Sequence, residues 1–199
     1  MTDIPAPNDA NVIEPPFQRF DSVAISFHWL TLLLIIGMFS TAWLRDWIGH
    51  SPEARLSPES QLLLGLHRSL GVTIWVVTVG RLAWRLTIAK LPPFPPRMSR
   101  VRQQVAKAVE YGLYLLLLIQ PLTGLAQTLF RGRPYMLLFF EVPAIVPEDA
   151  AIAKLFHQIH EAGAIALLSL IGVHALIVLF YQYILKHEML QRMLPSRRR

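Results

Sequence analysis

The stretch FHQIHEAGAIALLSLIGVHALIVLFYQYIL, from Phe156 to Leu185, decides the fold of this chain. It exceeds the roughly 20 apolar residues that a helix needs to cross a hydrocarbon core of about 30 Å. It also carries His160 and His174, which at about 100° per residue return to within about 40° on one helix face, about 21 Å apart along the axis. One face of a predicted membrane span therefore presents two imidazoles at two depths.

Composition places the chain among small helical membrane proteins. Its 199 residues are 53% hydrophobic and 16% charged, with a mean hydropathy of +0.41, which predicts one membrane domain and not a soluble one. Cysteine is absent, so disulfides, thiolate metal sites, iron–sulfur clusters and haem attachment through Cys are excluded. The net charge of +6 comes from basic residues at the ends of apolar runs, a pattern of membrane topology that does not indicate nucleic-acid binding.

The distribution of Lys and Arg residues predicts the membrane topology of the chain. An all-α bundle of four spans is expected, at about residues 23–44, 61–86, 105–129 and 156–185. The N-terminal segment with Arg19, the loop from Arg81 to Lys107 and the segment after Leu185 hold one, seven and five of the 19 Lys and Arg. The positive-inside rule therefore places both termini in the cytoplasm. We expect residues 19–195 to form the membrane domain, residues 1–18 a flexible cytoplasmic tail and residues 196–199 a basic tail.

Topology sorts four histidines into two layers. His28 opens the first span on the cytoplasmic side, and His67 opens the second on the external side. The fourth span begins outside, so His160 is external and His174 lies about 21 Å closer to the cytoplasm. Depth therefore pairs His28 with His174 and His67 with His160. An unpartnered imidazole in hydrocarbon is costly, so such residues indicate a functional site, although a buried histidine bonded to a carbonyl or Ser is the ordinary alternative.

Two histidines facing each other from adjacent helices suit a low-spin haem b, with both axial positions closed. Zinc or copper would need three or four ligands at one depth, and a proton relay would need acidic partners inside the spans. We therefore favour two haems over a transporter, a proton relay or purely structural histidines. His157 lies about 100° away from the face of His174, so it is expected near the surface.

Two arginines and two glycines are further candidates for cofactor contacts. Arg68 follows His67, and Arg81 lies near the cytoplasmic layer. Guanidinium groups there suit haem propionates, the alternative being that they extend to lipid headgroups. Gly71 and Gly163 lie three or four residues from proposed ligands, where we expect them to give clearance for a macrocycle, or to allow close helix packing.

Four parts of the sequence have a recognisable pattern. They are RFDSVAISFHWLTLLL from Arg19, LLGLHRSLGVTIWVVTVGRLAWRL around His67, YLLLLIQPLTGLAQTLFRGRPY around Pro121, and HEAGAIALLSLIGVHAL followed by LKHEMLQRMLP. Together they resemble the bacterial cytochrome b561 family, which is related to the cytochrome b subunits of nickel–iron hydrogenases. The resemblance covers about residues 19–195.

The resemblance implies four helices in the bacterial inner membrane, two haems b with His28, His67, His160 and His174 as ligands, and oxidation or reduction of membrane quinone. Members of the family include a superoxide oxidase that passes electrons to ubiquinone. We therefore expect an oxidoreductase that couples superoxide oxidation to ubiquinone reduction, with a basic external patch steering the anion. Residues expected in this patch are Arg68, Arg131, Arg133 and Lys154. The alternatives are a cytochrome b subunit fed by a partner hydrogenase or dehydrogenase and, outside redox chemistry, a small transporter.

Overall fold

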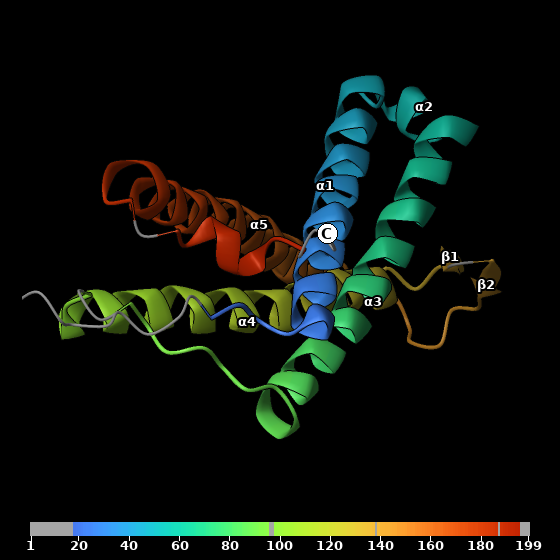
Figure 1. Cartoon of the computed structure of the whole chain (residues 1–199). Coiled ribbons are helices and arrows are strands. Elements are labelled where there is room, and N and C mark those ends of the chain that lie inside the picture. Colours follow the sequence, from blue (N-terminus) through green and yellow to red (C-terminus); the bar gives the residue numbers. More distant parts are fainter. Residues whose placement is uncertain (1–17, 96–97, 138, 187, 196–199) are drawn as a thin grey trace, which may run out of the picture.

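The structure is a computed structural model and describes residues 18–95, 98–137, 139–186 and 188–195. Most of this chain is helical, with one small hairpin of strands between the third and fourth long helices (Figure 1). In chain order the elements are α1 Ser22–Ile48, α2 Pro52–Arg55, α3 Pro58–Thr87, α4 Arg100–Leu129, β1 Tyr135–Leu137, β2 Phe140–Val142, α5 Ala150–Leu179, the π-helical turn η2 Phe180–Ile184 and the 3₁₀-helix η3 Leu190–Met193.

A side-chain cap begins each of the four long helices. Asp21 Oδ1 accepts hydrogen bonds from the backbone N–H groups of Val23 and Ala24, at 3.0 and 2.9 Å. Ser57 caps α3, Ser99 caps α4 and Asp149 caps α5 in the same way. These caps satisfy backbone donors that have no partner inside the helix, so they set where each helix starts.

The four long helices are each long and apolar enough to cross a membrane. Three of the expected spans lie within α1, α3 and α4, and the fourth ends one residue beyond η2. The helices extend past the apolar windows: α4 starts at Arg100, five residues before the expected span, and α5 at Ala150, six residues before. Hydropathy detects only the apolar part of a helix, whereas the caps decide its first turn.

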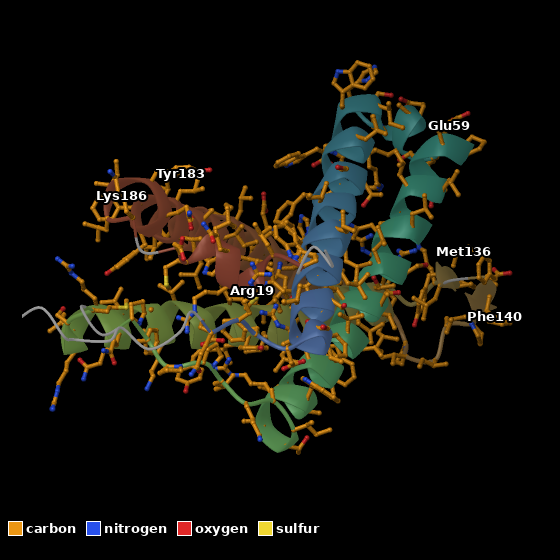
Figure 2. All side chains as sticks on the ribbon, in the orientation of Figure 1. Arg19, Glu59, Met136, Phe140, Tyr183 and Lys186 are labelled. Carbon is orange, nitrogen blue, oxygen red and sulfur yellow. The ribbon has the colours of Figure 1, made fainter. Side chains whose placement is uncertain are left out.

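Two antiparallel helical hairpins, α1–α3 and α4–α5, cross each other in the view of Figure 1. A small apolar core lies where α3, α4 and α5 meet, and Ile74, Leu117 and Leu167 form its buried centre. Many large apolar side chains are exposed, for example Leu33 and Leu176 at 66% and 67%. Figure 2 shows side chains extending outward along the long helices. Helices whose outer faces are apolar are typical of proteins surrounded by lipid.

A two-stranded sheet interrupts the expected all-α architecture. Strands β1 and β2 pair antiparallel, with Tyr135 opposite Val142 and Leu137 opposite Phe140. The prediction of a purely helical chain missed this hairpin because strands of three residues are too short to leave an alternating pattern in the sequence. The sheet packs beside α3, and Tyr135 is buried there.

The C-terminal segment is hydrogen-bonded to the N-terminal segment, near the start of α1, and to the loop between α3 and α4. Arg192 Nε donates to Gln18 O at 3.1 Å, and its Nη2 donates to Pro93 O at 2.5 Å. Trp29 Nε1 donates to Met193 O at 2.7 Å. Arg192 is only 8% exposed, and this burial lowers the pKa of its guanidinium. The three segments that carry most of the basic residues are thus linked through backbone carbonyls.

Candidate functional site

Helix α5 brings its two histidines to two different partners. The rings of His28 on α1 and His174 on α5 have centroids 6.3 Å apart and planes inclined at 57°. We call these two residues the α1–α5 pair. The rings of His67 on α3 and His160 on α5 have centroids 6.2 Å apart and planes inclined at 84°, and we call them the α3–α5 pair. The structure therefore brings together the same two pairs of histidines that we predict from their depth in the membrane.

Both spacings fit two imidazoles bound to one metal from opposite sides. A metal-bound imidazole nitrogen lies about 2.0 Å from the metal and the ring centroid about 1.1 Å further back, so the two centroids are about 6.2 Å apart. The α1–α5 and α3–α5 pairs, at 6.3 and 6.2 Å, match this separation. Within the described ranges, no group of three or more His, Cys, Asp or Glu side chains could hold a metal ion.

Hydrogen bonds orient the two rings of the α3–α5 pair. His67 Nδ1 lies 3.1 Å from Met38 O on α1, and His160 Nδ1 lies 3.0 Å from Gln120 O on α4. A carbonyl oxygen can only accept, so in each ring Nδ1 carries the proton and Nε2 keeps its lone pair. Both rings therefore have the tautomer that a metal ligand requires, and this tautomer is held by backbone on neighbouring helices.

Arg81 is the charged neighbour of the α1–α5 pair. Its Nη2 lies 3.3 Å from His28 Nδ1, and its guanidinium carbon lies 5.3 Å from the centroid of the Tyr114 ring on α4. A guanidinium next to a candidate haem ligand such as His28 is well placed to bind a haem propionate. The structure thus places Arg81 in the layer that the sequence predicted.

A cavity of about 420 Å³ lies beside the α3–α5 pair. His67, His160, Arg68 and Gly71 are in its wall. The volume is within the range of about 300–1,000 Å³ that is usual for cofactor and ligand sites. The guanidinium carbon of Arg68 lies 5.4 Å from the centroid of the Tyr135 ring of β1, which holds this cation at the edge of the cavity.

A second cleft, of about 600 Å³, adjoins the first cavity and shares Arg45, Arg68 and Arg131 with it. Five arginines line it, together with Glu141 and Glu148. The arginines are Arg45, Arg55, Arg68, Arg131 and Arg133. Lys154, which the sequence grouped with this patch, lies on α5 and is not in the lining. The excess of positive charge favours small anions in the cleft.

The glycines near the α3–α5 pair have different surroundings. A Cβ at Gly71 would meet only Met38 Sδ, at 3.8 Å, so this position leaves space at the cavity wall. A Cβ at Gly163 would collide with the side-chain amide of Gln120, so in this structure Gly163 makes room for Gln120. A Cβ at Gly124 would lie 2.9 Å from His160 Cε1. The sequence alone does not indicate a role for Gly124 at the site, because only the packing of α4 on α5 brings it against the ring.

The remaining histidines do not join the pairs. His157 has an exposed side chain whose Nδ1 lies 3.1 Å from Gln127 Oε1, although it reaches the edge of the 420 Å³ cavity. His50 is exposed after the end of α1. His187 lies outside the residues that the structure describes.

Comparison with known proteins agrees with the arrangement of helices and histidines. Residues 19–196 match the family model described as prokaryotic cytochrome b561, which covers nearly the whole chain. The chain belongs to the prokaryotic cytochrome b561 family. It is therefore a multi-pass bacterial membrane protein of a family that carries haem b and transfers electrons.

Individual relatives in the cytochrome b561 family align over almost their entire length. The chain is 31% identical to cytochrome b561 homolog 1 of Escherichia coli (strain K12) over 182 residues, which is 90% of this chain and 99% of the relative. It is 28% identical to cytochrome b561 homolog 2 of the same organism over 180 residues, 89% of this chain and 92% of the relative. It is 29% identical to the probable superoxide oxidase CybB of Yersinia pestis over 181 residues, 91% of this chain and 98% of the relative.

Proposed function

We propose that this cytochrome b561 protein carries two haems b and passes electrons across the bacterial inner membrane, from superoxide on the external side to ubiquinone. His28 and His174 are the ligands of one haem, and His67 and His160 are the ligands of the other. The observation that carries the proposal is the separation of the ring centroids, 6.3 and 6.2 Å, which suits two imidazoles on one metal. The haem b groups supply reversible one-electron oxidation and reduction.

The side chains around each pair suit the anionic edge of a haem. Arg81 lies beside His28 and Arg68 lines the cavity beside His67, so each layer has at least one guanidinium for a propionate. Gly71 leaves space at the cavity wall. Two imidazoles in each pair would hold the haem iron, so the haem would supply electron transfer and would not bind a substrate at its iron.

The orientation that we propose places both termini in the cytoplasm. The chain ends and the stretch from Arg81 to Lys107, which includes the end of α3 and the start of α4, hold most of the Lys and Arg residues, and such residues are retained on the cytoplasmic side. The α3–α5 pair and the arginine-lined cleft then lie on the external side. The α1–α5 pair lies on the cytoplasmic side, about 21 Å away along α5.

The arginine-lined cleft supports an anionic donor. Its arginines outnumber its two carboxylates, so the local field attracts a small anion towards the external layer. Superoxide is such an anion, and one relative is named a probable superoxide oxidase. Two superoxide ions each give up one electron and become dioxygen. One quinone takes the two electrons together with two protons and becomes the quinol.

Haem content tests the first part of the proposal. We expect the purified chain to bind two haems b per polypeptide and to show a b-type α-band in its reduced-minus-oxidised spectrum. A protein that contains no haem after expression with an ample haem supply would refute the proposal.

Quinone reduction tests the choice of donor. We expect the purified chain, without any partner, to reduce a soluble ubiquinone analogue when superoxide is generated enzymatically, and superoxide dismutase to abolish the reaction. A protein with two haems that does not react with superoxide would contradict superoxide as the donor. It would favour a cytochrome b subunit fed by a partner dehydrogenase or hydrogenase.

A further inference from the structure

Two helices present the same arrangement of oxygen atoms to the α3–α5 pair. On α1, Thr41 Oγ1 donates to Met38 O at 2.8 Å. On α4, Thr123 Oγ1 donates to Gln120 O, also at 2.8 Å. In both cases the threonine follows the carbonyl by three residues, which places hydroxyl and carbonyl side by side on one face of the helix. We call each arrangement a carbonyl–threonine acceptor.

Each carbonyl–threonine acceptor faces one imidazole. His160 Nδ1 lies 3.0 Å from Gln120 O and 3.1 Å from Thr123 Oγ1. His67 Nδ1 lies 3.1 Å from Met38 O, with Thr41 Oγ1 further away at 3.4 Å. Because each hydroxyl donates its hydrogen to the carbonyl, its lone pairs are free to face the ring. One Nδ1–H group is therefore shared between two oxygen atoms.

We propose that Thr41 and Thr123 are positioning residues that lower the reduction potential of the haem at the α3–α5 pair. The inference rests on the proposed function, since it assigns the threonines to one of the two haem sites. Each hydroxyl adds a second acceptor to a ring whose Nδ1–H already donates to a carbonyl. A stronger bond to Nδ1–H makes Nε2 a better electron donor, which favours the oxidised metal.

The α1–α5 pair has a different environment. His28 Nδ1 faces Arg81 Nη2 at 3.3 Å, and a guanidinium can only donate hydrogen bonds. Among the described residues, no carbonyl or hydroxyl group accepts a hydrogen bond from the ring of His174. Loss of a threonine hydroxyl should therefore change the haem at the α3–α5 pair alone.

Helix α4 holds the His160 acceptor in place by two further contacts. Gln120 Nε2 donates to His160 O by a short hydrogen bond, and Gly163 leaves room for this amide. Gln120 and Thr123 are both buried, at 5% and 7% exposure, which shields these bonds from competing water. The third span contains no histidine, yet it determines the direction of His160.

The test is an optical redox titration of the purified, haem-loaded chain and of the variants Thr41→Val, Thr123→Val and the double variant. Valine keeps the shape of threonine and removes the hydroxyl. The matched control is Thr73→Val, because Thr73 Oγ1 donates to Ser69 O within α3, at 2.9 Å, and makes no hydrogen bond to an imidazole in the part of the chain that the structure describes. The variant His160→Ala identifies which component of the titration belongs to the α3–α5 pair.

We expect each valine variant to raise the midpoint potential of that component and to shift its low-spin EPR signal, with the larger effect for Thr123→Val and the largest for the double variant. The other component and the Thr73→Val protein should be unchanged. If a valine variant loses haem, the corresponding serine variant, which restores the hydroxyl, should retain it.

Three results would overturn the inference: unchanged potentials in variants with two haems, equal shifts of both components, or haem loss in the serine variants as well. A parent chain that lacks haem would refute the proposed function before the threonines are tested. The two failures are therefore distinguishable.

Discussion

At the scale of single residues, two histidines of α5 that are less than one turn apart have different surroundings. His160 lies opposite His67, with its ring centroid 6.2 Å away, whereas the exposed His157 contacts Gln127. We predict that His160→Ala lowers the haem content from two to one per chain and that His157→Ala keeps both. The pyridine haemochrome assay measures this number. If the His157 variant lost a haem and the His160 variant kept both, His157 and not His160 would be the ligand.

Gly124 is a second residue whose role depends on its neighbour. An added Cβ would lie 2.9 Å from His160 Cε1, and the ring cannot easily move because Gln120 O and Thr123 Oγ1 hold it. We predict that Gly124→Ala shifts the EPR signal of one haem and lowers its occupancy. Gly172→Ala is the matched control, because a Cβ there would meet nothing within 4 Å. Equal effects of both substitutions would indicate that helix propensity, and not the ring contact, is responsible.

At the scale of elements, the 3₁₀-helix η3 connects the C-terminal segment to the segment before α1 and to the loop before α4. Arg192 donates to Gln18 O and Pro93 O, and its side chain is almost fully buried. We predict that Arg192→Ala destabilises the protein by about 1–3 kcal/mol, since it leaves carbonyls unpaired. Thermal denaturation in detergent, followed by loss of the haem spectrum, measures the effect. The control is Arg100→Ala, because the side chain of Arg100 is exposed at the start of α4. This variant should leave the midpoint temperature of denaturation unchanged. Similar midpoint temperatures in the two variants would contradict a structural role for Arg192.

Helix α4 shows how an element without a ligand can shape a site. Its sequence carries no histidine, so ligand patterns in the sequence direct attention away from it. In the fold, Gln120, Thr123 and Gly124 contact His160 from one face of α4. The apolar period of a helix shows which face is polar but not which neighbour it meets, so this role could not be predicted from α4 alone.

At the scale of the whole molecule, the two helical hairpins meet around a small apolar centre and the two histidine pairs. The buried apolar centre comprises Ile74, Leu117 and Leu167, and each histidine pair has one ring in each hairpin. A haem bound by a pair would therefore link the hairpins, and a ligand that binds only the folded state stabilises it by about 4 kcal/mol at 1,000 times its dissociation constant.

We predict that protein produced under haem limitation unfolds at a lower temperature and is cleaved faster by protease than protein produced with ample haem. Adding haem to the limited sample during expression should restore both properties. Equal thermal and protease resistance of haem-poor and haem-rich protein would show that the helices pack independently of the cofactor.

The sequence by itself predicted four spans and two pairs of histidines, and it determined the family. Apolar length, the recurrence of His160 and His174 on one helix face, and the motifs around His67 and Pro121 are local properties that need no knowledge of packing. The two pairings also followed from depth, because the order of the spans sets how deep each residue lies.

Only the tertiary structure decided which groups surround each ring. The acceptors at Met38 and Gln120, the contact of Gly124 with His160, and the use of Gly163 by the side chain of Gln120 depend on how helices cross and rotate against each other. The same holds for the short hairpin of β1 and β2 and for the buried Arg192. Hydrogen bonds between distant segments depend on three-dimensional distances, and a helical period or a hydropathy value contains no information about those distances.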